Sequence, residues 1–274
     1  MNRNHIVFII MDSCRYDSFM AASTPNIDRI GKAEKRFSYA SWTAPSHYVF
    51  TMGLLPHVSP PRVFASVVYK EEFVHWSKRI GGPNLAFKDF LPEISLPKVL
   101  TSLGYRTIAR VSMPVISQYT LISQHFDDYK LMDNHNDFAG MVEEIAFPED
   151  EPRFYFLNLG ETHYPYMLSG EGLPHISGVH GVVKSLDRGA HVDADSADRF
   201  FDMKQMGMLQ RQQVACVEYI DRYIGKLMSK APNNTYFIVT SDHGELFGEE
   251  GYFGHGPIMH NKCFEVPFVE GLLK

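Results

Sequence analysis

Residues 240–245 read Thr-Ser-Asp-His-Gly-Glu and follow directly on a β-branched and aromatic run at 235–239. That run predicts a buried strand, which delivers Asp242 and His243 to its C-terminal end. Open α/β sheets place their ligand sites at this end. A carboxylate and an imidazole suit a metal ion, and the Gly-His-Gly loop at 254–256 allows close folding around one. The alternative is an ordinary polar strand end, because Asp, His and Gly are also common in turns.

The composition of the 274 residues is typical of a globular enzyme, and the net charge of −6 gives no basic surface for nucleic acid. The cysteines Cys14, Cys216 and Cys263 are too far apart for a zinc ribbon or a disulfide framework. The apolar run at 6–11 is too short for a signal sequence, and no stretch approaches the roughly 18 apolar residues of a membrane span. We therefore expect a soluble cytoplasmic enzyme with no membrane anchor and no nucleic-acid partner.

Further segments predict a doubly wound sheet. Residues 6–11 form a continuous apolar run, as expected for a central parallel strand covered on both faces. A predicted helix at 95–103 precedes a strand at 105–111, and another buried strand spans 153–159. A long amphipathic helix is expected at about 200–230, because its apolar residues recur every three or four positions. The predicted fold class is α/β, with a mostly parallel sheet and helices on both faces.

Three more polar residues occupy informative positions. Asp12 follows the first strand, His163 follows the strand at 153–159, and Thr43 lies at or just before the start of a helix. A helix start favours an anion such as a phosphate. Each residue also has an ordinary alternative, as a helix N-cap or a hydrogen-bonded loop residue. Together with Asp242 and His243, however, they share one edge of the sheet, which favours a joint metal site.

At these positions the sequence resembles the alkaline phosphatase superfamily, and within it the sulfatase-like branch. The pattern is closest to the catalytic domains of phosphoethanolamine and phosphoglycerol transferases, which use a threonine nucleophile. The resemblance implies an alkaline phosphatase-like fold, with residues 1–274 as one catalytic domain that lacks the C-terminal subdomain of sulfatases. The matching segments are residues 9–17, 24–28, 43–46, 160–166, 241–245 and 254–256.

The resemblance also implies roles for individual residues. Asp12, Thr43, Asp242 and His243 would bind a divalent ion, and the hydroxyl of Thr43 would also be the nucleophile. A phospho-threonine intermediate would then be released by water or by an acceptor alcohol. Zinc and manganese fit such a set of oxygen and imidazole donors equally well, as one ion or two.

Three histidines complete the expected site. His163 and His255 match histidines that bind a second metal ion, or the phosphoryl oxygens and the leaving group.

Sulfatases carry Cys or Ser, matured to formylglycine, in a Cys/Ser-x-Pro-Ser-Arg motif, whereas residues 43–47 read Thr-Ala-Pro-Ser-His. Threonine cannot become formylglycine, which counts against sulfate esters. His47 replaces the arginine and is expected to contact the substrate.

The predicted function is a metal-dependent phosphoester hydrolase or phosphotransferase that acts on a small, soluble, anionic substrate. Two alternatives remain open, namely a sulfate-ester or phosphonate hydrolase on the same scaffold and a non-catalytic metal-binding protein of the same fold. Irregular insertions at about 58–93 and 168–198 are expected to shape specificity. The second insertion contains His175, His180 and His191, to which the sequence assigns no role.

Overall fold

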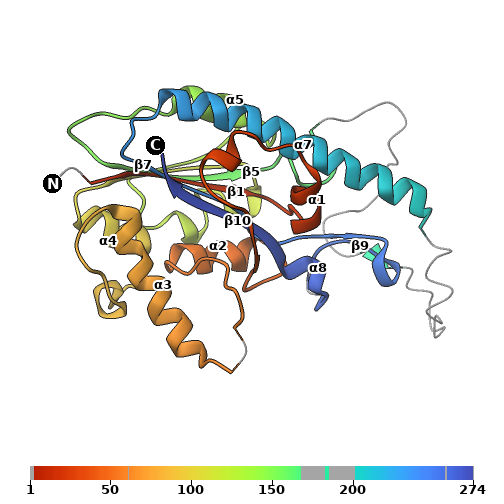
Figure 1. Cartoon of the computed structure of the whole chain (residues 1–274), viewed down its shortest axis with the longest axis horizontal. Helices are drawn as coiled ribbons and strands as arrows, with labels where there is room; N and C mark the ends of the chain where they lie inside the picture. The colour runs from red at the N-terminus through yellow and green to blue at the C-terminus, as the bar shows by residue number, and fades with distance from the viewer. Residues whose placement is uncertain (1–2, 61, 168–182, 185–200, 257, 274) are drawn as a thin grey trace.

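The computed structural model describes residues 3–60, 62–167, 183–184, 201–256 and 258–273 (Figure 1). The strands of its main sheet are β1 (His5–Met11), β2 (Glu34–Phe37), β3 (Arg106–Val111), β4 (Asp128–Leu131), β5 (Arg153–Leu159), β7 (Thr235–Ser241) and β10 (Glu265–Leu272). Their order in the sheet is β2-β10-β7-β1-β5-β3-β4. Strand β1 pairs in parallel with both β5 and β7, whereas β10 runs antiparallel to β7 and β2. The sheet is therefore mostly parallel, as the sequence predicts.

Helices cover both faces of this sheet. They are α1 (Tyr16–Ala21), α2 (Thr43–Thr51), α3 (Ala65–Ile80), α4 (Leu96–Ser102), α5 (Phe138–Glu144), α7 (Met203–Lys230) and α8 (Asn261–Phe264). Single 3-10 turns are η1 (Ile27–Arg29), η2 (Phe87–Phe90), η3 (Pro114–Ile116), η4 (Leu121–Ser123) and η5 (Glu249–Gly251). Helices α5 and α7 lie on one face, and α2, α3 and α4 lie on the other (Figure 1). The predicted doubly wound α/β fold is thus confirmed.

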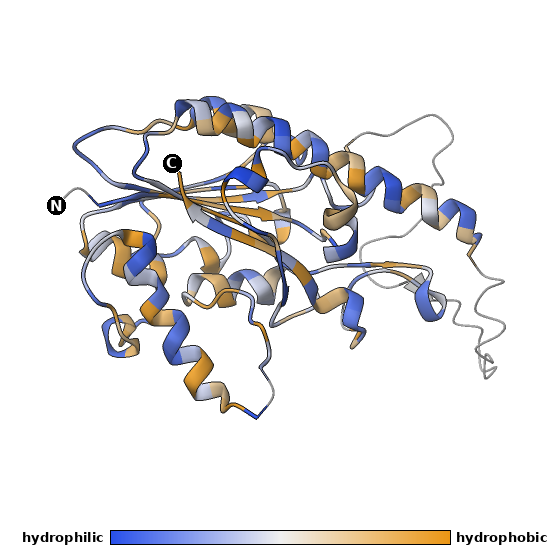
Figure 2. Ribbon diagram, viewed as in Figure 1, coloured by the Kyte–Doolittle hydropathy of each residue, from blue (hydrophilic) through white to orange (hydrophobic). Residues whose placement is uncertain are grey.

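Strand β1 shows how the sequence produces these two layers. The central strands of the sheet are coloured mostly hydrophobic (Figure 2). Successive side chains of a strand point to opposite faces, and both faces of β1 are apolar. The side chains on the α7 side are Val7, Ile9 and Met11. Those on the α3 side are Ile6, Phe8 and Ile10. Burying each such side chain stabilises the fold by roughly 1.5–3 kcal/mol, so the end of β1 is a firm support for the loop that begins at Asp12.

A second, smaller sheet lies beyond the end of β7. Its strands are β6 (Val183–Lys184), β8 (Leu246–Phe247) and β9 (Tyr252–Gly254), in the order β6-β9-β8. Strands β8 and β9 form an antiparallel pair, with Phe247 opposite Phe253. The chain leaves this pair at His255 and returns toward the main sheet.

The expectation of little regular structure at 58–93 is wrong. Helix α3 occupies the middle of this range and ends at Gly81, whose φ of 66° is typical of a helix C-cap. The helical periodicity is hidden because a charged residue, Arg79, takes a buried position. Its guanidinium pairs with Glu72 at 2.6 Å and with Glu270 of β10 at 2.8 Å.

The second expected insertion, at 168–198, lies outside the described residues apart from β6. His175, His180 and His191 therefore also lie outside them. Among the helices that the structure describes, none combines the length and the apolar character that a membrane span requires.

Candidate active site

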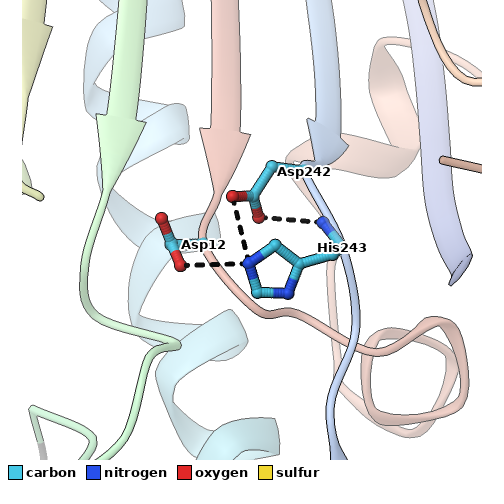
Figure 3. Close-up of side chains that lie close together, drawn as sticks. All are labelled: Asp12, Asp242 and His243. Atoms are coloured by element: carbon cyan, nitrogen blue, oxygen red, sulfur yellow. Dashed lines mark hydrogen bonds and ion pairs between the residues drawn. The ribbon is translucent and has the colours of Figure 1, made fainter. Parts of the chain in front are cut away.

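Three neighbouring strands end side by side at the carboxyl edge of the sheet. Met11, the last residue of β1, is level with Ser241 of β7 and Leu159 of β5. The residues that come after these strands are therefore brought together. Asp12 follows β1 and Asp242 follows β7, so the two carboxylates lie next to each other (Figure 3).

The four residues predicted to bind a metal ion converge at this edge. The Nε2 atom of His243 lies 3.3 Å from Oδ2 of Asp242 and 3.8 Å from Oδ1 of Asp12 (Figure 3). Thr43 begins helix α2, and its Oγ1 lies 3.3 Å from Nε2 of His243 and 3.5 Å from Oδ1 of Asp12. One ligand atom from each of Asp12, Asp242 and His243 falls within 4.8 Å of the others. All four side chains are buried.

Two of the histidines are held in the tautomer that suits a metal ligand. The Nδ1–H of His243 donates to the carbonyl of Gly244 at 2.9 Å, and that of His163 donates to the carbonyl of Tyr164 at 2.7 Å. Each Nε2 atom therefore keeps its lone pair. Burial lowers the pKa of both imidazoles, so neither carries a proton on Nε2 near neutral pH.

The carboxylate of Asp242 is only half satisfied. Its Oδ1 accepts hydrogen bonds from the backbone N–H of Ser13 at 3.1 Å and of His243 at 2.9 Å. Its Oδ2 is buried and accepts no hydrogen bond from any described residue. Burial and the neighbouring charge of Asp12 raise the pKa of Asp242 well above its usual value. A divalent cation would satisfy this oxygen and offset the repulsion, so the residues fit a metal ion.

Asp12 is oriented by two residues of the neighbouring chain segment. Asn158 of β5 donates from Nδ2 to Oδ2 of Asp12 at 3.0 Å, and Thr162 donates from Oγ1 to the carbonyl of Asp12 at 2.7 Å. Burial opposes ionisation, but nearby imidazoles, foremost that of His163, lower the pKa of Asp12 below its usual value. Asn158 is not among the residues predicted from the sequence. In the sequence, the feature that could have indicated its role is a single amide side chain within the apolar part of strand β5.

His255 lies against the other histidines. Its ring centroid is 4.3 Å from that of His243 and 5.1 Å from that of His163. Its Nδ1 lies 3.3 Å from Oγ of Ser13 and 3.8 Å from Oε2 of Glu245. The flanking glycines, residues 254 and 256, have φ values of 82° and 131°, which L-residues with side chains rarely adopt. The glycine spacing is thus required by the turn that presents the imidazole.

A reciprocal pair of hydrogen bonds joins the His255 loop to the segment before Thr43. The hydroxyl of Ser41 donates to the carbonyl of Gly256 at 2.6 Å, and the N–H of Gly256 donates to the carbonyl of Ser41 at 3.2 Å. Ser41 precedes Thr43 by two residues, and Gly256 follows His255 directly. The position of the imidazole is therefore tied to that of the Thr43 hydroxyl.

His47 lies one helical turn after Thr43 and is fully buried. Its Nδ1–H donates to the carbonyl of Thr43 at 2.8 Å and lies 3.6 Å from Oδ2 of Asp242. The rings of Phe50 and Phe156 pack against it, and its Nε2 has no hydrogen-bond partner within the described ranges. Burial lowers the pKa of this imidazole. Its contacts are thus with Thr43 and Asp242, at the base of the cluster.

The protein has a mostly parallel sheet with a cluster of buried carboxylates and imidazoles at its carboxyl edge. These two features place it in the class of α/β proteins with an alkaline phosphatase-like fold. The family model of the sulfatases matches residues 4–269, so the chain belongs to the sulfatase family. Proteins of similar structure include a phosphoethanolamine transferase and a protein whose substrate is a sulfated sugar. No curated protein matches the sequence.

Solved structures agree with this fold. The C-terminal periplasmic domain of EcEptC from Escherichia coli, in complex with zinc, is 13% identical with a TM-score of 0.56, over 100% of this chain and 74% of that one. BT4656 in complex with its substrate D-glucosamine-2-N,6-O-disulfate is 16% identical with a TM-score of 0.60, and the match covers 98% of this chain and 71% of that one. The C-terminal periplasmic domain of the phosphoethanolamine transferase EptC from Campylobacter jejuni is 13% identical with a TM-score of 0.53, and the match covers 98% of this chain and 79% of that one.

The expected cytoplasmic location is wrong. Two of these structures are periplasmic domains, and each match extends over at least 98% of this chain. The expectation rested on composition and on the absence of a long apolar run, and neither property distinguishes the two compartments. A periplasmic domain has the same polar surface and apolar core as a cytoplasmic one.

Proposed function

We propose that this protein is a metal-dependent phosphoester hydrolase or phosphotransferase in which Thr43 is the nucleophile. The observation that carries the proposal is the position of the Thr43 hydroxyl, within 3.5 Å of both Oδ1 of Asp12 and Nε2 of His243. A hydroxyl among buried carboxylates and neutral imidazoles is in suitable surroundings for activation. The substrate proposed is a small anionic phosphoester, and residues 1–274 form one catalytic domain.

The ligands proposed for the main ion are Asp12, Thr43, Asp242 and His243. Their atoms are two carboxylate oxygens, one hydroxyl oxygen and one imidazole nitrogen, a set that suits zinc or manganese. A divalent ion bound there lowers the pKa of the Thr43 hydroxyl and offsets the charge of the phosphoryl oxygens. This assignment is supported by Oδ2 of Asp242, which has no hydrogen-bond partner in the described part of the chain, and by the lone pair on Nε2 of His243.

The chain itself supplies the remaining parts of the reaction. Thr43 begins α2, where the first N–H groups of a helix have no intrahelical acceptor and favour phosphoryl oxygens. The hydroxyl of Thr43 loses its proton to solvent and Oγ1 attacks phosphorus. The bond from phosphorus to the leaving oxygen breaks, that oxygen takes up a proton from solvent to leave as the alcohol, and a phospho-threonine forms. Water or an acceptor alcohol then attacks the same phosphorus and releases Thr43. Since each step is a displacement at phosphorus, the stereochemistry is retained overall.

His163 and His255 are proposed to contact the phosphoryl oxygens and the leaving group, or to hold a second ion. Their rings lie 5.1 Å apart, and both side chains are nearly buried beside the main cluster. The substrate contact expected of His47 is a weaker proposal, since this side chain is fully buried and bonded to Thr43. We assign it instead to the support of Thr43 and Asp242.

A sulfate-ester hydrolase on the same scaffold is the second candidate, and the match to the sulfatase family model favours it. Threonine at position 43 disfavours it, because threonine cannot be matured to formylglycine. A screen with added zinc or manganese, using phosphomonoesters, phosphodiesters, phosphonates and sulfate esters, separates the candidates. Turnover of phosphoesters is expected, and turnover of sulfate esters alone would overturn the proposal. Less than half an equivalent of bound metal and no turnover would favour a non-catalytic protein.

A further inference from the structure

Helix α7 carries a fully buried glutamine whose amide reaches three separate loops. The Nε2 atom of Gln213 donates to the carbonyl of Ser13 at 3.0 Å, to the carbonyl of Thr162 at 3.1 Å and to Oε1 of Glu245 at 3.0 Å. Its Oε1 accepts from the backbone N–H of Arg15 at 3.4 Å. The amide orientation follows from these neighbours, since three acceptors surround the nitrogen and a donor faces the oxygen.

The three acceptors belong to the loops that carry the proposed active-site residues. Ser13 follows Asp12 at the end of β1, Thr162 precedes His163 beyond β5, and Glu245 is two residues past His243 beyond β7. These loops are far apart in sequence, at separations of 200, 51 and 32 residues from the glutamine. One side chain thus sets the spacing between all three.

Two of the Gln213 contacts, those with Ser13 and Glu245, extend to proposed active-site side chains. Ser13 has a φ of 61°, in the left-handed region that residues other than glycine rarely adopt. In this conformation its N–H donates to Asp242 while its carbonyl accepts from Gln213. Glu245 also accepts from the hydroxyl of Tyr166 at 2.7 Å, and its other oxygen lies 3.8 Å from Nδ1 of His255. The amide therefore supports both the carboxylate and the imidazole side of the cluster.

We infer that Gln213 is a positioning residue, which holds the loops after β1, β5 and β7 at the spacing that the metal ion and the phosphoryl group require. The inference rests on the proposed function. Because the amide touches none of the reacting atoms, its effect acts through Asp12, His163 and His243. Removing it leaves the carbonyls of Ser13 and Thr162 without a donor among the described residues, and the strained turn at Ser13 loses one of the bonds that hold it.

The same helix provides a matched control. Asp221, eight residues along α7, is also buried, and its carboxylate accepts three hydrogen bonds, compared with the four bonds of Gln213. It accepts from the N–H of Asn26 at 3.0 Å, from Nδ2 of Asn26 at 2.8 Å and from the N–H of Ile27 at 2.8 Å. These contacts tie α7 to η1 and not to the site loops. A merely structural role for Gln213 predicts that Gln213→Met and Asp221→Leu behave alike.

The test compares wild-type protein, Gln213→Met and Asp221→Leu by amide hydrogen exchange and by calorimetric titration with zinc. In Gln213→Met, the amides at 13–15, 161–163 and 243–245 should all exchange at least about 10-fold faster, because the loops lose a shared restraint. Zinc affinity should fall at least about 10-fold in the same variant, since the ligand spacing is lost. Asp221→Leu should leave both properties at the wild-type level while lowering the melting temperature.

Equal exchange in the three loops of Gln213→Met and wild type would overturn the inference, as would a change confined to α7. If Gln213→Met does not fold, Gln213→Asn carries the same test, because it retains the amide but withdraws it by one methylene. Failure of the proposed function is distinguishable. It would appear as wild-type protein that neither binds zinc nor turns over phosphoesters, whereas the exchange experiment is read without metal or substrate.

Discussion

Among the clusters of buried charge in the described part of the chain, one lies at the carboxyl edge of the sheet and another lies between α3 and β10. In the second, the guanidinium of Arg79 faces the carboxylates of Glu72 and Glu270 at 2.6 and 2.8 Å, so each charge has a partner. In the first, Asp12 and Asp242 repel each other, and one buried oxygen of Asp242 has no hydrogen-bond partner among the described residues. The proposed cation would therefore bind in the first cluster and not in the second.

The difference separates a structural role from a functional one. A buried charge that is paired is tolerated as part of the fold, whereas unpaired carboxylates cost free energy unless a ligand offsets the cost. The cluster at the sheet edge is therefore unfavourable in the metal-free protein and favourable when a cation is bound. Substitutions at Thr43, Arg79, Glu161 and Asp242 test this contrast.

Replacing Thr43 with alanine removes the proposed nucleophile and its contacts with Asp12 and His243, while every carboxylate and imidazole of the site is retained. We expect phosphoester turnover to fall by at least about 10³-fold while the melting temperature stays near the wild-type value. Steady-state kinetics and thermal unfolding check this. Thr43→Ser keeps a hydroxyl and should retain measurable turnover. Full activity in Thr43→Ala would remove Thr43 from the reaction.

Replacing Arg79 with methionine breaks the satisfied cluster. Glu72 and Glu270 would then lose the guanidinium that pairs with both of them, and breaking a buried pair typically costs about 3–5 kcal/mol. Denaturant unfolding should show a destabilisation of this order, with zinc affinity unchanged in the folded variant. A loss of zinc affinity would mean that the two clusters are coupled, and their separate roles would then be untenable.

Glu161 is another buried carboxyl, outside both clusters: its Oε1 accepts from the N–H of Phe138 at 2.7 Å, and its Oε2 has no hydrogen-bond partner among the described residues. Burial raises the pKa of this carboxyl from 4.5 to about 7, so the folded protein keeps its proton where the unfolded chain has lost it. Its contribution to stability is present below pH 4.5 and is lost as the pH rises through about 7. Glu161→Gln should remove a pH dependence on the order of 3 kcal/mol from this window. Parallel wild-type and variant stability curves from pH 4 to 8 would contradict this.

Replacing Asp242 with asparagine relieves the repulsion in the metal-free protein. The amide oxygen can still accept from the N–H groups of Ser13 and His243, while the new NH₂ group faces the lone pair of His243. We expect the metal-free variant to be more stable than wild type by roughly 1 kcal/mol, and added zinc to give no further stabilisation. Thermal unfolding with and without zinc measures both. A marked loss of metal-free stability would show that this carboxylate is needed for the fold.

Much of the fold and of the candidate site is predictable from sequence because it depends on local pattern. The apolar runs before Asp12, His163 and Asp242 predict strands, and parallel strands bring their ends to one edge. Helix α3 was not predictable, because Arg79 and its partners interrupt the apolar periodicity and only the folded sheet shows that they are paired.

The polar residues that orient the site, Asn158 and Gln213, were also not predictable from the sequence. Asn158 looks like an irregularity in an apolar strand, and Gln213 looks like one of several glutamines on an amphipathic helix. Their partners lie 146 and up to 200 residues away, so their contacts exist only after the topology is fixed. Residues that carry chemistry are thus visible in short motifs, whereas residues that orient them are visible only in three dimensions.

The claim that the unsatisfied cluster activates Thr43 is tested most directly by trapping the intermediate. Wild-type protein with zinc or manganese would be mixed with a phosphoester, quenched with acid during turnover and digested for tandem mass spectrometry. We predict one added phosphoryl group on Thr43, which disappears when a chelator is added beforehand or when Asp242→Asn is used. Turnover of the phosphoester with Thr43 unmodified, or with phosphate on another residue, would contradict the account.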